Sequence, residues 1–104
     1  MLSVTDDTFE AEIGGHRGLA LVDFTGEGCP ACRRLSPVLD ELATEMPDQA
    51  KFAKVDVYEN NDLAVRFGIQ SIPQLVLFKD GAEVDRLVGY QVKSRLANWL
   101  KSKG

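Results

Sequence analysis

The sequence has few of the residues that build metal sites, disulfide frameworks or membrane spans. Its 104 residues include two cysteines, one histidine and one tryptophan. No stretch approaches the ~18 consecutive apolar residues of a membrane helix. Low-complexity tracts and internal repeats are absent as well, so we expect one globular domain over residues 1–104. A chain of this length can bury one core without disulfide staples.

The sequence also lacks a secretory signal and an excess of basic residues. The first residues, MLSVTDDTFEAEI, contain neither the basic segment nor the apolar run of a secretory signal, so we expect a cytoplasmic protein. A permanent structural disulfide is not expected in that reducing compartment. Twelve basic residues against sixteen acidic ones give a net charge of −4. Because the basic residues are scattered, we expect no nucleic-acid partner. We also expect a monomer.

Apolar patterning alternates between helical and strand-like segments along the chain. Spacings of three and four predict helices, and short apolar runs between glycines predict buried strands. The helices are expected at 5–14 (capped by Thr5 or Asp6), 30–46, 60–67 and 92–102, and the strands at 19–24, 51–57, 74–78 and 82–88. The last two strands form a hairpin, so the fold class is α/β with a mixed sheet and helices on both faces.

The two cysteines are separated only by Pro30 and Ala31, in the segment FTGEGCPACRR. A structural zinc ion needs four ligands, and two thiols with His16 do not supply them, so no metal is expected. Pro30 suits the first position of a helix, which makes Cys29 the predicted N-cap. The helix dipole and free N–H groups there stabilise a thiolate and lower its pKa. We therefore predict Cys29 as the nucleophile and Cys32, one turn deeper, as the resolving thiol.

Asp23 is the one charged residue in the apolar run LALVDF. Desolvation raises the pKa of a buried carboxyl and brings its proton exchange closer to neutral pH. We predict that Asp23 accepts the proton of Cys32 as that thiol attacks. Two other interpretations stay open: an ordinary aspartate at a strand end, or a structural partner of Lys54.

Nearly the whole chain resembles thioredoxin. The resemblance rests on V-D-F six residues before the first cysteine, a proline five residues after the second, and then the motifs A-K-V-D-V, G-I-x-S-I-P and F-K-D-G in order. It implies a thioredoxin fold, with a central mixed β-sheet flanked by helices on both faces. Asp23 matches the family's buried aspartate, Lys54 the lysine near it, and Pro37 the proline that kinks a helix.

The resemblance also implies a substrate groove. Ile72 and Pro73 match the family's cis-proline peptide, which lies beside the cysteines. The backbone of Ile72 is then expected to pair with an extended substrate segment. Gly89 flanks this groove, where the lack of a side chain lets another backbone approach.

The active-site motif departs from the usual W-C-G-P-C of the family. Gly28 stands before the first cysteine, Pro30 and Ala31 stand between the two, and Thr25 replaces another common tryptophan. The missing rings would supply apolar contact area, so substrate and reductase recognition should differ. Pro30 and Ala31, with Lys54 and Pro37, are expected to tune the redox properties of the pair.

The expected activity is the reduction of protein disulfides by dithiol–disulfide exchange. The resemblance implies recharging by a thioredoxin reductase, an NADPH-dependent flavoprotein, and no cofactor bound to the chain itself. Two alternatives remain open at this point. One is a glutaredoxin-like protein recharged by glutathione, and the other is a binding adaptor in which the cysteines are incidental.

Overall fold

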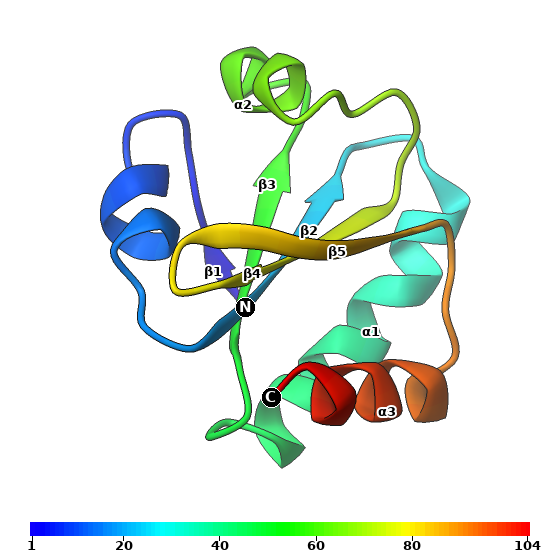
Figure 1. The fold of residues 1–104 in the computed structure, drawn as a ribbon. Helices are drawn as coiled ribbons and strands as arrows, with labels where there is room; N and C mark the ends of the chain where they lie inside the picture. The colour runs from blue at the N-terminus through cyan, green and yellow to red at the C-terminus, as the bar shows by residue number, and fades with distance from the viewer.

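Five strands form one mixed sheet at the centre of the protein, in a computed structural model that describes residues 1–104 (Figure 1). They are β1 (Leu2–Ser3), β2 (Leu19–Thr25), β3 (Lys51–Asp56), β4 (Gln74–Lys79) and β5 (Ala82–Val88). Their order across the sheet is β1-β3-β2-β4-β5. Strands β1 and β2 run parallel to β3, whereas β4 runs antiparallel to both β2 and β5. The mixed sheet predicted from the sequence is confirmed.

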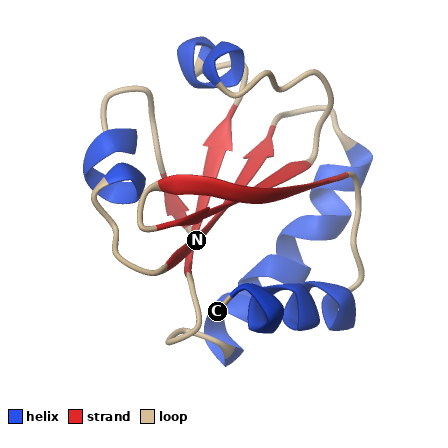
Figure 2. Cartoon of the chain, in the orientation of Figure 1, coloured by secondary structure: helices blue, strands red, loops and turns tan.

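Helices cover both faces of this sheet (Figure 2). One face carries α1 (Pro30–Glu45) and α3 (Lys93–Lys103), whose buried leucines pack against leucines of β2 and β4. The other face carries a π-helix, η1 (Glu10–Gly14), and α2 (Asn61–Arg66), which pack against a second apolar cluster. The central strands β2 and β4 are therefore buried on both faces, as their near-continuous apolar sequences require.

The side chains of β2 alternate between the two clusters. Ala20, Val22 and Phe24 belong to the cluster beneath η1 and α2. Leu19 and Leu21 belong to the cluster beneath α1 and α3. Because successive side chains of a strand point to opposite faces, Asp23 lies on the face that α1 and α3 cover. The strand register thus places this carboxyl on the same side of the sheet as the helix that carries Cys32.

The N-terminal segment differs from the sequence-based prediction. A regular helix from Thr5 or Asp6 was expected. Helical turns do begin there, because the Phe9 N–H donates to the Thr5 carbonyl, but they widen into the π-helix η1, where the Gly15 N–H donates to the Glu10 carbonyl five residues back. Phe9 and Ile13 are buried on its inner face, as predicted. The strand β1, which is only two residues long, was not predicted because so short an edge strand has no readable periodicity.

Asp6 caps a different helix from the one expected. Its Oδ1 accepts the Leu63 N–H of α2 at 3.0 Å, and its own N–H donates to Asn60 Oδ1 at 2.9 Å. The prediction that it caps the first helix is therefore wrong. The carboxylate satisfies a free N–H near the start of a helix far along the chain, which local spacing cannot reveal.

Replacing Asp6 by Ala should lower the free energy of unfolding by about 1 kcal/mol, the usual cost of losing an N-terminal helix cap. Asp7→Ala is the matched control, because Asp7 is exposed and its side chain makes no hydrogen bond. Urea denaturation of both variants measures the difference. Equal stability of the two variants would contradict a capping role for Asp6.

Candidate functional site

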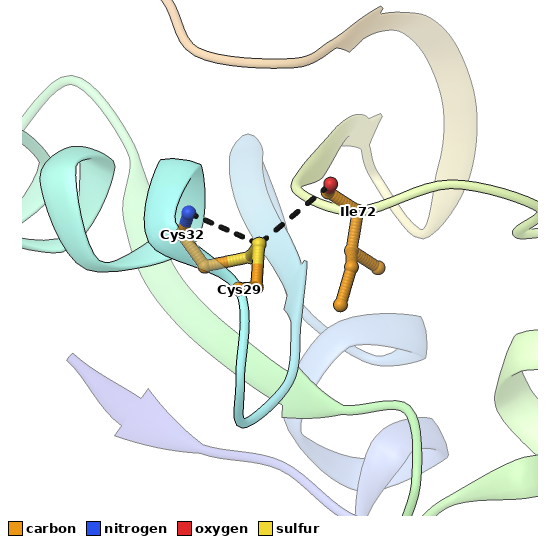
Figure 3. Close-up of a disulfide and its surroundings, with 3 residues drawn as sticks. All are labelled: Cys29, Cys32 and Ile72. Carbon is orange, nitrogen blue, oxygen red and sulfur yellow. Dashed lines mark hydrogen bonds between the residues drawn. A yellow bond between two sulfur atoms is a disulfide. The ribbon is translucent and has the colours of Figure 1, made fainter.

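The N-terminus of α1 is capped by a cysteine. Cys29 has extended backbone angles (φ −113°, ψ 101°), and its Sγ accepts the Cys32 N–H at 3.2 Å (Figure 3). Pro30 is the first helical residue. The N–H at that position has no partner within a helix, so a proline there costs no hydrogen bond. The predicted N-cap is confirmed. A sulfur in this position faces the positive end of the helix dipole.

A disulfide joins Cys29 to Cys32, whose Cα atoms lie 5.2 Å apart. The two sulfur-bearing residues differ in exposure: Cys32 is 4% exposed, whereas Cys29 is half-buried. Cys32 lies one turn into α1, on the side that also buries Leu35. An incoming sulfur therefore reaches Cys29 before Cys32.

A cis peptide bond between Ile72 and Pro73 lies directly opposite the disulfide. The Cys29 Sγ is 3.8 Å from the Ile72 carbonyl oxygen, which faces it in Figure 3. In the reduced protein this oxygen can accept a hydrogen bond from the Cys29 thiol. The cis-proline expected beside the cysteines is confirmed.

Gly89 joins the same region through Pro73. Its N–H donates to the Pro73 carbonyl at 2.8 Å. Its φ of +86° lies in the left-handed region that favours glycine, and a Cβ placed there would meet no atom within 4 Å. The positive φ therefore explains why a glycine occupies position 89, and no other atom fills the space where a side chain would be.

Asp23 is buried without a hydrogen-bond partner. It is 2% exposed, and its Oδ1 contacts no donor. Burial raises the pKa of this carboxyl to about 7, while the positive charge of Lys54 lowers it in part. The two residues face each other in the register of β2 and β3, yet no ion pair joins them. Asp23 is also not at a strand end, because β2 continues to Thr25.

Three further residues were predicted from the sequence to belong to the site: Ala31, Pro37 and Lys54. Ala31 is half-buried in the first turn of α1, and Pro37 is exposed further along the same helix. Lys54 is exposed on β3. No cluster of three or more histidine, cysteine or acidic side chains that could hold a metal ion is present.

The positions of the missing tryptophans have distinct surroundings. Gly28 is exposed with a φ of +73°, so any larger residue there would be strained without a change of backbone. Thr25 ends β2 and is half-buried. Neither position offers an aromatic surface beside the nucleophile.

Two tyrosines near the site were not singled out in the sequence. Tyr90 follows Gly89, is 40% exposed, and lies 5.5 Å below the guanidinium of Arg34, measured to the ring centroid. Tyr58 is 71% exposed, and its ring lies against Gly26. The adjacency to Gly89 could have drawn attention to Tyr90. Nothing in the local sequence connects Tyr58 with Gly26, because the two residues lie in separate loops.

Comparison with known proteins agrees with this geometry. A family model described as thioredoxin matches residues 1–102. The chain is 46% identical to thioredoxin 1 of Synechococcus elongatus over 98 residues, which cover 94% of this chain and 92% of that protein. It is 43% identical to a thioredoxin of Staphylococcus haemolyticus over 100 residues, covering 96% and 94% of the two chains.

These matches cover almost the full length of this chain and of the relatives compared with it. The site also contains a cysteine pair at a helix N-terminus opposite a cis-proline. The glutathione-linked and adaptor alternatives are not favoured. The chain belongs to the thioredoxin family of protein-disulfide oxidoreductases.

Proposed function

We propose that this protein reduces disulfide bonds of other proteins with Cys29 as the attacking thiol and Cys32 as the resolving thiol. The geometry of the α1 N-terminus carries the proposal. Cys29 is the more exposed of the two, and its sulfur accepts an N–H where the helix dipole favours negative charge. Cys32 is nearly buried and suited to attack only within a complex.

The exchange proceeds in two displacements. The Cys29 thiolate attacks one sulfur of the target disulfide, and the other target sulfur leaves as a thiolate and takes up a proton. Deprotonated Cys32 then attacks the Cys29 sulfur and expels the second target thiolate. Two electrons pass to the target, and the Cys29–Cys32 disulfide, the form seen in the structure, is the product.

Asp23 accepts the proton that Cys32 must lose. It lies on the sheet face that α1 covers, and it has an unpaired oxygen. Its pKa of about 7 allows it to be ionised in a large fraction of molecules at neutral pH and still to bind a proton. The charge of Lys54 favours the ionised form and so tunes this base.

The target segment binds in an extended conformation across the cis-proline loop. The Ile72 backbone pairs with it, as in β-strand addition, while the open surface at Gly89 admits its main chain. Pro30 and Ala31 set the redox poise through the first turn of α1, and Pro37 bends that helix further along.

Thioredoxins act on disulfide substrates and are recharged by thioredoxin reductase. For this chain we propose an NADPH-dependent flavoprotein as that reductase, and a cytoplasmic monomer with a single domain over residues 1–104. None of its helices combines the length and apolar content that crossing a membrane requires. The rates at which glutathione and a thioredoxin reductase reduce the oxidised protein can be measured in parallel. Faster reduction by glutathione would point to the glutaredoxin-like alternative.

The wild-type protein should accelerate the reduction of insulin disulfides by dithiothreitol, because it presents a preorganised thiolate to the target. Turbidity of the precipitating insulin B chain measures the rate. The double variant Cys29→Ser/Cys32→Ser controls for binding without exchange and should match dithiothreitol alone. Wild-type turnover no faster than that background would contradict the enzyme activity.

Replacing Cys32 by Ser should trap a covalent complex between Cys29 and the target, because no thiol remains to resolve it. Non-reducing gel electrophoresis detects the adduct. Cys29→Ser is the matched control and should trap little, since Cys32 is 4% exposed. More adduct with Cys29→Ser than with Cys32→Ser would reverse the two roles.

Asp23→Asn should slow the resolution of the mixed disulfide near neutral pH, because the amide cannot accept the Cys32 proton. At a pH of about 9.5 the difference should narrow, since hydroxide then ionises a free thiol. Stopped-flow release of a fluorescent peptide from the mixed disulfide gives the rate. Equal slowing across the pH range would argue against proton transfer by Asp23.

The same carboxyl should make stability depend on pH. Its pKa is 3.8 ordinarily and about 7 in the fold, so the folded protein binds more protons between these values. The free energy of unfolding therefore falls as pH rises through this window, by about 4 kcal/mol in total. The Asp23→Asn variant lacks this dependence, so its stability relative to wild type should rise from pH about 4 to pH about 8. Urea denaturation across that range tests the prediction, and a constant difference would refute it.

A further inference from the structure

Tyr58 is the most exposed aromatic residue recorded near the site. It lies in the turn after β3 with 71% of its surface exposed. The turn itself is well anchored. The Tyr58 N–H donates to Asp56 Oδ1 at 2.9 Å, and the Val57 N–H donates to the Thr25 carbonyl at 2.9 Å. The backbone that carries the ring is thus tied to the end of β2, immediately before the loop that leads to Cys29.

The ring of Tyr58 extends this turn to the active-site loop. A Cβ placed on Gly26 would lie 2.5 Å from Tyr58 Cε2 and 3.0 Å from Ile72 Cδ1. Both side chains therefore crowd the same face of Gly26, and only a glycine leaves room for them. Tyr58 and Ile72 thus lie on either side of the same small space beside Gly26, and the Ile72 carbonyl oxygen lies 3.8 Å from the Cys29 sulfur.

An exposed tyrosine in this position has an energetic reason to contact a partner. A tyrosine ring offers a large contact area and has few torsions to immobilise on binding. The charges in this part of the chain have no common sign: exposed Glu59 follows Tyr58 and exposed Glu27 follows Gly26, whereas exposed Arg33 and Arg34 lie near the start of α1. The Tyr58 ring therefore contributes apolar contact area to the binding of a partner, whereas the net charge around it contributes little.

We propose that Tyr58 is a specificity-determining residue that binds the target segment on the Ile72 side of the groove. It packs against an apolar side chain next to the reactive cysteine of the target. The ring takes over contact area that Gly28 and Thr25 do not provide. This inference rests on the proposed reduction of protein disulfides, and it adds the substrate class: extended segments with an apolar residue beside the cysteine.

The proposal can be tested with two peptide disulfides, one with leucine and one with serine next to the cysteine. A third substrate, bis(2-hydroxyethyl) disulfide, is too small to reach Tyr58 and serves as a control. Dithiothreitol regenerates the protein, so no reductase contributes to the rates. Tyr58→Ala should lower kcat/KM for the leucine peptide by about tenfold, mainly through KM, the size expected when one central aromatic contact is lost. The serine peptide and the small disulfide should change by no more than about twofold.

Three further variants separate binding by the ring from other effects. Tyr58→Phe keeps the ring and should retain the preference for leucine. Gly26→Ala should weaken it, because the new methyl group displaces the ring without removing it. Val84→Ala is the matched control, an exposed apolar residue (46%) on β5 away from the Gln74–Val88 end of the hairpin, and should behave as wild type.

Equal effects of Tyr58→Ala on all three disulfides would overturn the inference, because they would mean that the ring only supports Ile72. No effect on any of them would overturn it as well. In both cases the wild type still reduces disulfides, so the proposed function survives. A wild type that reduces none of the three would remove the proposed function and this inference together.

Discussion

The hydrogen bond from the Cys32 N–H to the Cys29 sulfur fixes the geometry on which the site depends. It forms because Cys29 has an extended conformation while Pro30 already begins α1. The helix is held in place by leucines at positions 35, 39 and 42, which are buried against the sheet. The position of a reactive sulfur is thus set by core packing, and the cis-proline loop completes the site from the opposite side.

Burial of the Asp23 carboxyl costs free energy, because the group loses its hydration without gaining a hydrogen-bond partner. Its side chain points to the same face of the sheet as Leu19 and Leu21, which belong to the apolar cluster beneath α1 and α3, so an aliphatic side chain would fit the pattern of β2. The carboxyl instead loses its hydration and has a pKa of about 7. Such conflicts between local stability and residue choice are typical of functional sites. The exposed Tyr58 represents a milder case, since it leaves apolar surface in water beside the groove.

The parts of the structure that sequence could predict are those with local signals. Apolar periodicity located β2, β3 and β4, and Pro30 after Cys29 located the helix start. The capping of α2 by Asp6 and the contact of Tyr58 with Gly26 could not be predicted. Both join segments that are distant along the chain, and their partners are fixed only once the sheet brings the loops together. The cis peptide at Pro73 followed from family resemblance and not from the residues alone.

We expect the α1 N-terminus to activate Cys29 and to shield Cys32. Alkylation of the reduced protein by iodoacetamide as a function of pH, with each adduct located by mass spectrometry, tests it most directly. Cys29 should be modified first, with a half-maximal rate below the pH of ~8.5 typical of a free cysteine, while Cys32 stays protected. Modification of both thiols in parallel, with half-maximal rates near pH ~8.5, would contradict it.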